Sequence, residues 1–231
     1  MTDIRIDPRF QAAAFQTAAA ALHQAPPDRG FEVAFAGRSN AGKSSAINAL
    51  CHQRQLARTS KTPGHTKQIV FFRLDDERRL VDLPGYGFAR VSLAVKSAWQ
   101  RLMSEYLHRR RCLRGLILIM DIRHPLTELD RHLLTWTQDA ELPVRILLTK
   151  ADKLTRGAIA RTLSEVSHEL ASLRKIEAQA FSAHTGLGLA AAQDWIGARL
   201  ALSARVSPDS GRAGESSVPA EAAAPATPVS F

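Results

Sequence analysis

The sequence predicts an α/β fold in three layers, with helices on both faces of a mostly parallel, six-stranded sheet. Three observations lead to it. The length of 231 residues suits one domain of ordinary size, with or without a tail. A content of 45% hydrophobic and 23% charged residues allows a buried core. Between residues 30 and 202, short apolar runs alternate with helical patterns, which is typical of an open sheet covered on both sides.

The predicted strands are continuous apolar runs, at residues 31–36, 68–74, 79–82, 115–120, 144–149 and 176–181. Helical spacing of apolar residues predicts helices at 43–51, 92–111, 127–140, 156–173 and 187–202. Thr127 with Asp130 resembles a capping box that starts the third helix. Trp99, Trp136 and Trp195 lie in these helices and are expected in the core or half-buried. Ligands of such sheets bind beyond the carboxyl ends of the strands.

The two ends of the chain are expected to differ from this central domain of residues 30–202. Residues 1–29 read as an N-terminal extension, in which the Ala-rich stretch 10–22 predicts a short helix before Pro26-Pro27. Residues 203–231 read as a disordered tail rich in Ala, Pro and Ser, because from residue 207 on they contain no Leu, Ile or Met.

Composition excludes several classes of protein. Two cysteines, Cys51 and Cys112, cannot form a disulfide framework and fit a reduced cytoplasmic compartment. The longest apolar run, residues 116–120, is far short of the roughly 20 residues that a membrane span needs. The N-terminus mixes acidic and basic residues, unlike a signal peptide. We therefore expect a cytoplasmic protein that does not act at a membrane.

Directly after the first predicted strand, the sequence GRSNAGKS matches the phosphate-binding pattern G-x-x-x-x-G-K-[ST]. Its glycines let the backbone wrap closely around phosphates, and the following helix adds the positive end of its dipole. Lys43 is expected to reach the β- and γ-phosphates, and the Ser44 hydroxyl to ligate Mg²⁺. The nucleotide-binding residues predicted here are Gly37, Arg38, Ser39, Asn40, Ala41, Gly42, Lys43 and Ser44.

A second element, Asp82-Leu83-Pro84-Gly85, ends a short predicted strand. An Asp there can hold Mg²⁺ through water, and the Gly85 N–H can contact the γ-phosphate. Alone, D-x-P-G is more often a turn, but here it follows the phosphate loop by about 40 residues and lies on a strand end. We therefore assign Asp82, Leu83, Pro84 and Gly85 to the site.

Between these motifs lies the loop TSKTPGHTKQ, residues 59–68. Thr66 is expected to be the second hydroxyl ligand of Mg²⁺, because it follows Pro63-Gly64 and precedes a strand; an ordinary loop threonine is the alternative. The further nucleotide-binding residues predicted here are Gly64, His65, Lys67 and Gln68.

Base specificity is predicted from Thr149, Lys150, Ala151 and Asp152, which follow the fifth strand. A carboxylate only accepts hydrogen bonds, so Asp152 can pair with the two adjacent donors of guanine but not with adenine. The aliphatic stem of Lys150 can lie over the base. After the sixth strand, Phe181, Ser182 and Ala183 can offer a backbone N–H to the guanine carbonyl. The pattern predicts GTP rather than ATP, and so disfavours a small-molecule kinase.

The motifs GRSNAGKSS, TPGHTKQ, DLPGYGFA, MDIRHPLT, TKAD and FSA, in this order over residues 10–202, resemble the EngB (YihA/YsxC) family of bacterial ribosome-biogenesis GTPases. The resemblance implies a Ras-like P-loop GTPase fold that cycles between GTP and GDP. It also implies Mg²⁺ bound by Ser44 and Thr66, and a role in late assembly of the large ribosomal subunit. Loss of such a protein is expected to disturb cell division and septation.

Two residues bear on hydrolysis. Tyr86 occupies the position where many small GTPases place a Gln that orients water, and Tyr cannot do this in the same way. Slow intrinsic hydrolysis that accelerates on the correct partner is therefore expected. Asn40 matches the Asn with which related GTPases hold K⁺, a cation that could replace the charge of an arginine finger. A turn residue tolerated for its backbone geometry is the equal alternative.

The net charge of +9, from 31 basic and 22 acidic residues, is local. Residues 51–74 contain five basic and no acidic residues, and residues 87–114 contain seven basic residues and one acidic. These segments flank the expected nucleotide-sensing loops, so the GTP form is expected to dock on ribosomal RNA of a large-subunit precursor. A solvated basic face is the alternative, as is a nucleotide-gated binding module with negligible hydrolysis. A monomer is expected. Asp121, Arg123 and Pro125, past the fourth strand, are expected to serve loop structure, and contact with the nucleotide or a partner is the alternative.

Overall fold

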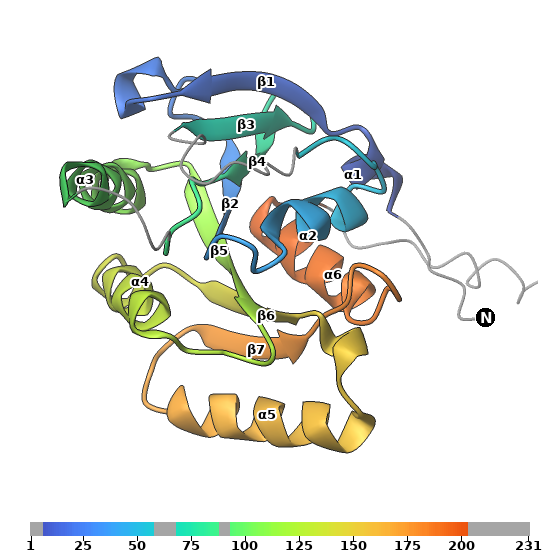
Figure 1. Cartoon of the computed structure of the whole chain (residues 1–231). Coiled ribbons are helices and arrows are strands. Elements are labelled where there is room, and N and C mark those ends of the chain that lie inside the picture. The colour runs from blue at the N-terminus through green and yellow to red at the C-terminus, as the bar shows by residue number, and fades with distance from the viewer. Residues whose placement is uncertain (1–6, 58–67, 88–92, 203–231) are drawn as a thin grey trace, which may run out of the picture.

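The computed structural model describes residues 7–57, 68–87 and 93–202, with only the backbone described at 93–96. Within these ranges the chain forms a seven-stranded sheet in the order β1-β3-β4-β2-β5-β6-β7 (Figure 1). Four of the six strand pairs are parallel; β3 pairs antiparallel with β1 and with β4. The strands are β1 Ala14–Ala19, β2 Phe31–Gly37, β3 Ile69–Arg73, β4 Arg78–Asp82, β5 Leu113–Asp121, β6 Val144–Thr149 and β7 Ile176–Ala180.

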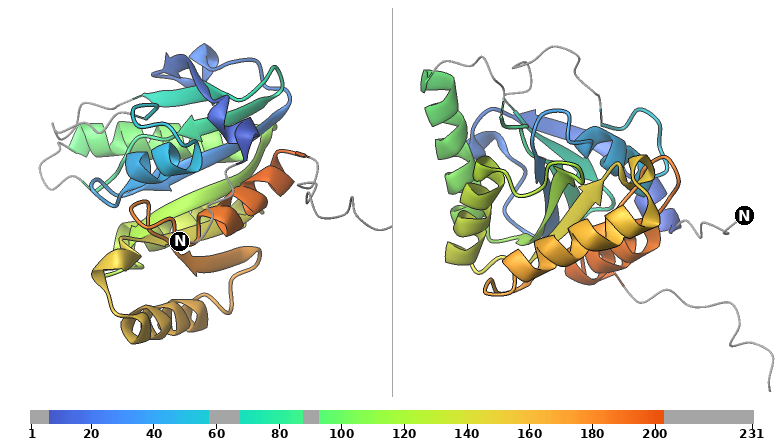
Figure 2. Two further views of the ribbon diagram at one scale, coloured as in Figure 1. Left: turned by 90° about the vertical axis from the view of Figure 1, so that its right-hand side faces the viewer. Right: turned by 60° about the horizontal axis from the view of Figure 1, so that its bottom comes forward.

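Helices cover both faces of this sheet, as the sequence predicts. They are α1 Pro8–Gln11, α2 Lys43–Leu50, α3 Leu93–Arg109, α4 Glu128–Asp139, α5 Arg156–Glu169 and α6 Leu189–Arg199, with short 3₁₀ turns at Leu22–Gln24 and Ala151–Lys153. Figure 2 shows α3 and α4 on the face opposite to α2 and α6. The predicted three-layer α/β fold is therefore confirmed, with one strand more than expected.

Alternation along the central strands divides the core into two halves. In β2, Val33 and Phe35 pack with α2 and α6, whereas Ala34 and Ala36 face the side covered by α3, α4 and α5. Successive side chains of a strand point to opposite faces, so a continuous apolar run can serve both halves. The buried strands β2 and β5 thus show the unbroken hydrophobic pattern expected of a sheet with two covered faces. Trp195 is buried, while Trp99 and Trp136 are half-buried, as predicted.

The extra strand lies where a helix was expected. The prediction of a helix over residues 10–22 is wrong, since β1 pairs with the edge of β3, with a register shift between Phe15 and Thr17. Within the part described before it, which begins at residue 7, a single helical turn, α1, precedes β1 and is capped by Asp7 through the Arg9 N–H at 3.0 Å. Alanine favours helices, but pairing with an otherwise open strand edge overrides that weak preference. The predicted tail, residues 203–231, lies outside the described residues, and the expected domain boundaries stay predictions.

A buried cluster of charged side chains stabilises the start of β2. Glu32 is fully buried and accepts from Arg79 at 3.1 Å, from Arg110 at 2.9 and 2.6 Å, and from the Tyr106 hydroxyl at 3.1 Å. A carboxylate without these donors would be unfavourable in a protein interior. The cluster therefore joins β2, β4 and α3 at the end of the sheet opposite to the strand ends discussed next.

Among the described helices, none has the length and hydrophobicity required to cross a membrane.

Candidate functional site

The phosphate-loop motif forms a tight turn between β2 and α2. Gly37 has no room for a side chain, because a Cβ there would lie 2.7 Å from the Ile119 carbonyl oxygen. Gly42 has φ +102° immediately before α2, a conformation that L side chains rarely adopt. The Ala46 N–H donates to the Gly42 carbonyl at 2.8 Å, and the helix begins at the lysine of the motif, Lys43. The positive end of α2 therefore points to where phosphates would bind.

Lys43 and Asp82 form an ion pair at this turn, and their side chains are 12% and 9% exposed. Lys43 starts α2 and Asp82 ends β4, so the pair shows that both predicted residues reach the same point. Ser44, which is partly buried, follows Lys43 in the first turn of α2. A hydroxyl and a carboxylate are the hard oxygen ligands that suit Mg²⁺, which takes its remaining ligands from phosphates and water. The described residues therefore fit this metal.

Gly85 and Tyr86 lie against the phosphate loop. A Cβ on Gly85 would be 3.6 Å from the Gly37 oxygen and 3.7 Å from the Ser39 nitrogen. Tyr86 makes two backbone contacts with the loop, accepting from the Ser39 N–H at 2.8 Å and donating to the Gly37 carbonyl at 3.4 Å. Its side chain is buried, and its hydroxyl donates to Asp130 of α4 at 2.7 Å. The hydroxyl is therefore already engaged, which agrees with the expectation that Tyr86 does not orient water as Gln does.

The residues predicted to read the base lie at the ends of β6 and β7. The buried Ser182 hydroxyl donates to the Asp152 carboxylate at 2.7 Å, and Lys153 lies 3.3 Å from its other oxygen. The bond from Ser182 lowers the pKa of Asp152, opposed by burial, so the carboxylate stays charged and accepting. Ser182 also accepts from the His184 and Thr185 N–H groups, at 3.3 and 3.2 Å. This holds the turn that contains Ala183 next to Asp152.

Hydrogen bonds join the base motif to the phosphate loop. The buried Thr149 hydroxyl contacts the Ala41 carbonyl and also the Met120 carbonyl at 3.0 Å. The Lys150 ammonium donates to the Asn40 carbonyl at 2.7 Å and lies 2.9 Å from Asp121. Its stem thus runs from the base motif to the phosphate loop, consistent with packing over a base.

Asn40 is exposed and has φ +63°, a left-handed conformation that Asn tolerates better than most residues. This geometry alone explains an Asn at this position. Asp121 accepts three bonds from Arg123, at 3.1, 2.9 and 2.7 Å, which supports the structural role expected for both residues.

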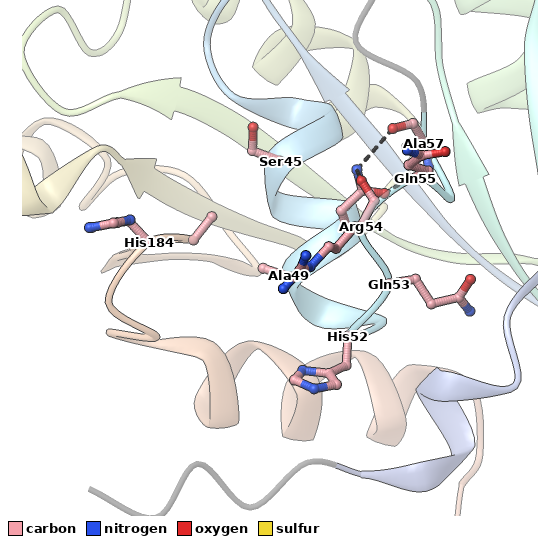
Figure 3. Close-up of a pocket in the computed structure, with 10 residues that line it drawn as sticks. Ser45, Ala49, His52, Gln53, Arg54, Gln55, Ala57 and His184 are labelled. Carbon is pink, nitrogen blue, oxygen red and sulfur yellow. Dashed lines mark hydrogen bonds between the residues drawn. The ribbon is translucent and has the colours of Figure 1, made fainter. Parts of the chain in front are cut away.

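A cleft of about 940 Å³ adjoins the base-binding turn, between the outer side of α2 with the turn after it and residues 183–184 (Figure 3). Asn48 shapes this turn by bonding both the N–H and the carbonyl of Ala57, at 2.7 and 2.9 Å. Exposed side chains of His52, Arg54 and His184 line the cleft. The sequence does not single out these residues, because they belong to no motif; His52 and Arg54 only fall within the basic segment 51–74.

The basic residues of segment 87–114 do not all lie where the sequence predicts. Arg110 is buried against Glu32 and is not available to RNA, and Arg109 lies 3.3 Å from Glu105. Arg111 and Arg114 are exposed, but they flank the beginning of β5, opposite to the carboxyl ends that carry the nucleotide motifs. Residues 109–114 therefore do not flank a nucleotide-sensing loop, which corrects that part of the prediction.

Part of the predicted site lies outside the described residues. This applies to Gly64, His65, Thr66 and Lys67, so the predicted second hydroxyl ligand of Mg²⁺ is not placed. Gln68, which is exposed, directly precedes β3. The structure brings together the remaining predicted residues, at the carboxyl ends of β2, β4, β6 and β7.

Comparison with known proteins agrees with this arrangement. The family described as "50S ribosome-binding GTPase" matches residues 32–150. Two relatives named "Probable GTP-binding protein EngB", from two strains of Coxiella burnetii, are 50% identical over 190 residues, which cover 82% of this chain and 93% of each relative.

Solved structures support the fold. A crystal structure of a probable GTP-binding protein engB has a TM-score of 0.58 at 17% identity, covering 74% of this chain and 98% of the other. Era in complex with MgGDPNP and nucleotides 1506–1542 of 16S ribosomal RNA has a TM-score of 0.58 at 19% identity, covering 74% and 57%.

Proposed function

The chain belongs to the EngB family of GTP-binding proteins, and from this premise we propose that it is a GTP-dependent switch in late assembly of the large ribosomal subunit. The observation that carries the nucleotide part is the bonding of Thr149 and Lys150 to the carbonyls of Ala41 and Asn40. These two hydrogen bonds join the phosphate loop and the base motif into one continuous site. Cells that lack the protein are expected to show defects in division and septation.

In the proposed complex, Lys43 contacts the β- and γ-phosphates and the Gly85 N–H contacts the γ-phosphate. Ser44 and Thr66 are the direct protein ligands of Mg²⁺, and Asp82 holds the ion through water. The bound ion neutralises charge on the phosphates. Asp152, oriented by Ser182, pairs with the two guanine donors. Calorimetric titration with GDP, GTP and ATP tests this part, and ATP binding as tight as GTP would contradict it.

We propose that hydrolysis of GTP is slow in the isolated protein, because the Tyr86 hydroxyl is bonded to Asp130. A K⁺ ion held by Asn40 is proposed to supply positive charge near the phosphates. Turnover measured in K⁺ and in Na⁺ tests the role of the ion. Equal rates in the two salts would remove it.

The proposed partner is ribosomal RNA. Support comes from the matched family, described as 50S ribosome-binding, and from Arg54 and Arg73, the described basic residues of segment 51–74, which are both exposed. Co-sedimentation with large ribosomal subunits, under GTP, GDP and nucleotide-free conditions, is expected to show most binding with GTP. Affinity should fall as salt rises, because contacts with phosphates release counterions. Equal binding in all three conditions would contradict a switch.

A second candidate function is a nucleotide-gated binding module with negligible hydrolysis. The engaged hydroxyl of Tyr86 favours it, since Tyr86 occupies the position of the missing Gln and its hydroxyl is already bonded to Asp130. Single-turnover hydrolysis with and without large subunits separates the two functions. Acceleration by the subunits supports the GTPase switch, whereas an unchanged, negligible rate supports the module.

A further inference from the structure

Tyr86 connects the phosphate loop to helix α4. Its main chain accepts from the Ser39 N–H at 2.8 Å and donates to the Gly37 carbonyl at 3.4 Å. Its side chain is only 3% exposed, and its hydroxyl donates to Asp130 at 2.7 Å. One residue therefore contacts both the loop that would hold phosphates and the first turn of a helix on the face of the sheet.

Asp130 serves two purposes at once. It is 1% exposed, and one of its oxygens accepts from the Thr127 N–H and hydroxyl, at 2.9 and 2.6 Å, which caps α4 as predicted. The other oxygen accepts from Tyr86. Burial and the neighbouring Asp130 raise the pKa of the Tyr86 hydroxyl well above its ordinary value, so it remains protonated and donates.

Trp99 of α3 fixes the other side of the same short segment. Its indole N–H donates to the Pro84 carbonyl at 3.0 Å, and its ring centre lies 5.3 Å from that of Tyr86. Gly85 therefore lies between two anchored residues, Pro84 held by α3 and Tyr86 held by α4. Because peptide units are planar, fixing both neighbours restricts the direction of the Gly85 N–H.

We propose that Tyr86 is a positioning residue that discriminates GTP from GDP, by holding the Gly85 N–H toward the γ-phosphate through its bond to Asp130. This inference rests on the proposed nucleotide site. GDP lacks the γ-phosphate, so the bond contributes to the affinity for GTP alone. By thermodynamic reciprocity, GTP in turn stabilises the bond between Tyr86 and Asp130. The first turn of α4 thereby senses the nucleotide.

Affinities of variants for GDP and for a non-hydrolysable GTP analogue, both with Mg²⁺, provide the test. Tyr86→Phe is expected to weaken the GTP analogue about tenfold, which corresponds to about 1.4 kcal/mol, and to leave GDP binding unchanged. Tyr106→Phe is the matched control. Tyr106 is also fully buried with its hydroxyl on a carboxylate, Glu32 at 3.1 Å, but at the other end of β2. It should change neither affinity.

If Tyr86→Phe weakens both nucleotides equally, or neither, while the unsubstituted protein binds both, Tyr86 is only structural and the inference is overturned. An unsubstituted protein that binds neither nucleotide overturns the proposed function, and the inference with it.

Amide hydrogen exchange of the unsubstituted protein gives an independent measurement that requires no variant. The Thr127 N–H, which donates to Asp130, is expected to exchange more slowly with the GTP analogue bound than with GDP bound. Equal exchange in the two complexes would overturn the inference even if Tyr86→Phe fails to fold.

Discussion

The substitution Asp152→Asn is expected to change the preferred base from guanine to xanthine. The Asp152 carboxylate has two oxygens, one of which accepts from Ser182 at 2.7 Å. In the variant, the Ser182 hydroxyl still donates to the amide oxygen, so the amide nitrogen takes the place of the other oxygen. Donors of the variant then face the donors of guanine. Xanthine carries a carbonyl where guanine carries its exocyclic amine, and this carbonyl can accept from the new amide.

The magnitude follows from the bonds that are lost. Two hydrogen bonds from guanine to a charged carboxylate contribute about 1.5–3 kcal/mol each, so a loss of about 3–6 kcal/mol is expected. This corresponds to a GDP affinity lower by a factor of about 10² to 10⁴. The affinity of the variant for xanthosine diphosphate should be higher than that of the unsubstituted protein.

Isothermal titration with both diphosphates measures the exchange of preference. Asp139→Asn is the control, since Asp139 is exposed at the end of α4 and the same change of charge there should leave both affinities unaltered. A GDP affinity within a factor of about ten of the original would refute the reasoning, because the loss would be smaller than one charged hydrogen bond. A variant that loses affinity for GDP without gaining affinity for xanthosine diphosphate would refute it as well.

Three further outcomes are expected. Lys43→Ala should weaken GDP and GTP by about 10- to 100-fold in filter-binding assays, because it removes a charged phosphate contact; unchanged affinities would place the phosphates elsewhere. Glu32→Ala should lower the free energy of unfolding in urea by about 3–5 kcal/mol, since it leaves two arginines buried without their carboxylate. Glu169→Ala is the control, because the ion pair of Glu169 with Arg131 is half-exposed and its loss should cost less than about 1 kcal/mol. Asp121→Asn should make stability fall less steeply below pH 4. Hydrogen bonds from Arg123 lower the Asp121 pKa from 3.8, so the stability that the charged carboxylate contributes is present above pH 3.8 and is lost as the pH falls through the lowered pKa. Identical acid transitions of the variant and the unsubstituted protein would contradict this.

The nucleotide motifs could be predicted from sequence because each requires particular residue types at a fixed local spacing. Gly37, Gly42 and Lys43 are contained in one turn, and the structure places them as the pattern requires. Thr127 and Asp130 are three residues apart, so the cap of α4 could also be predicted. Strand positions followed from continuous apolar runs, because β2 and β5 are buried on both faces.

Features that depend on distant partners could not be predicted. The bond between Tyr86 and Asp130 joins residues 44 positions apart, and neither position signals the other. Arg110 belongs to the basic segment 87–114, and nothing local reveals that Glu32, 78 positions away, accepts from it inside the protein. The Ala-rich stretch that forms β1 has the composition of a helix, and only the open edge of β3 makes it a strand.

Strand β1 also determines how the protein can be shortened. It covers the edge of β3, whose hydrogen-bonding groups on that side would otherwise be free to pair with another molecule. A fragment that begins at residue 30 would keep every described nucleotide motif, yet it would expose the backbone of β3 beside the buried Phe71 and Phe72. Such a fragment is expected to self-associate in size-exclusion chromatography. Deletions from the N-terminus should therefore stop before Asp7, which caps α1.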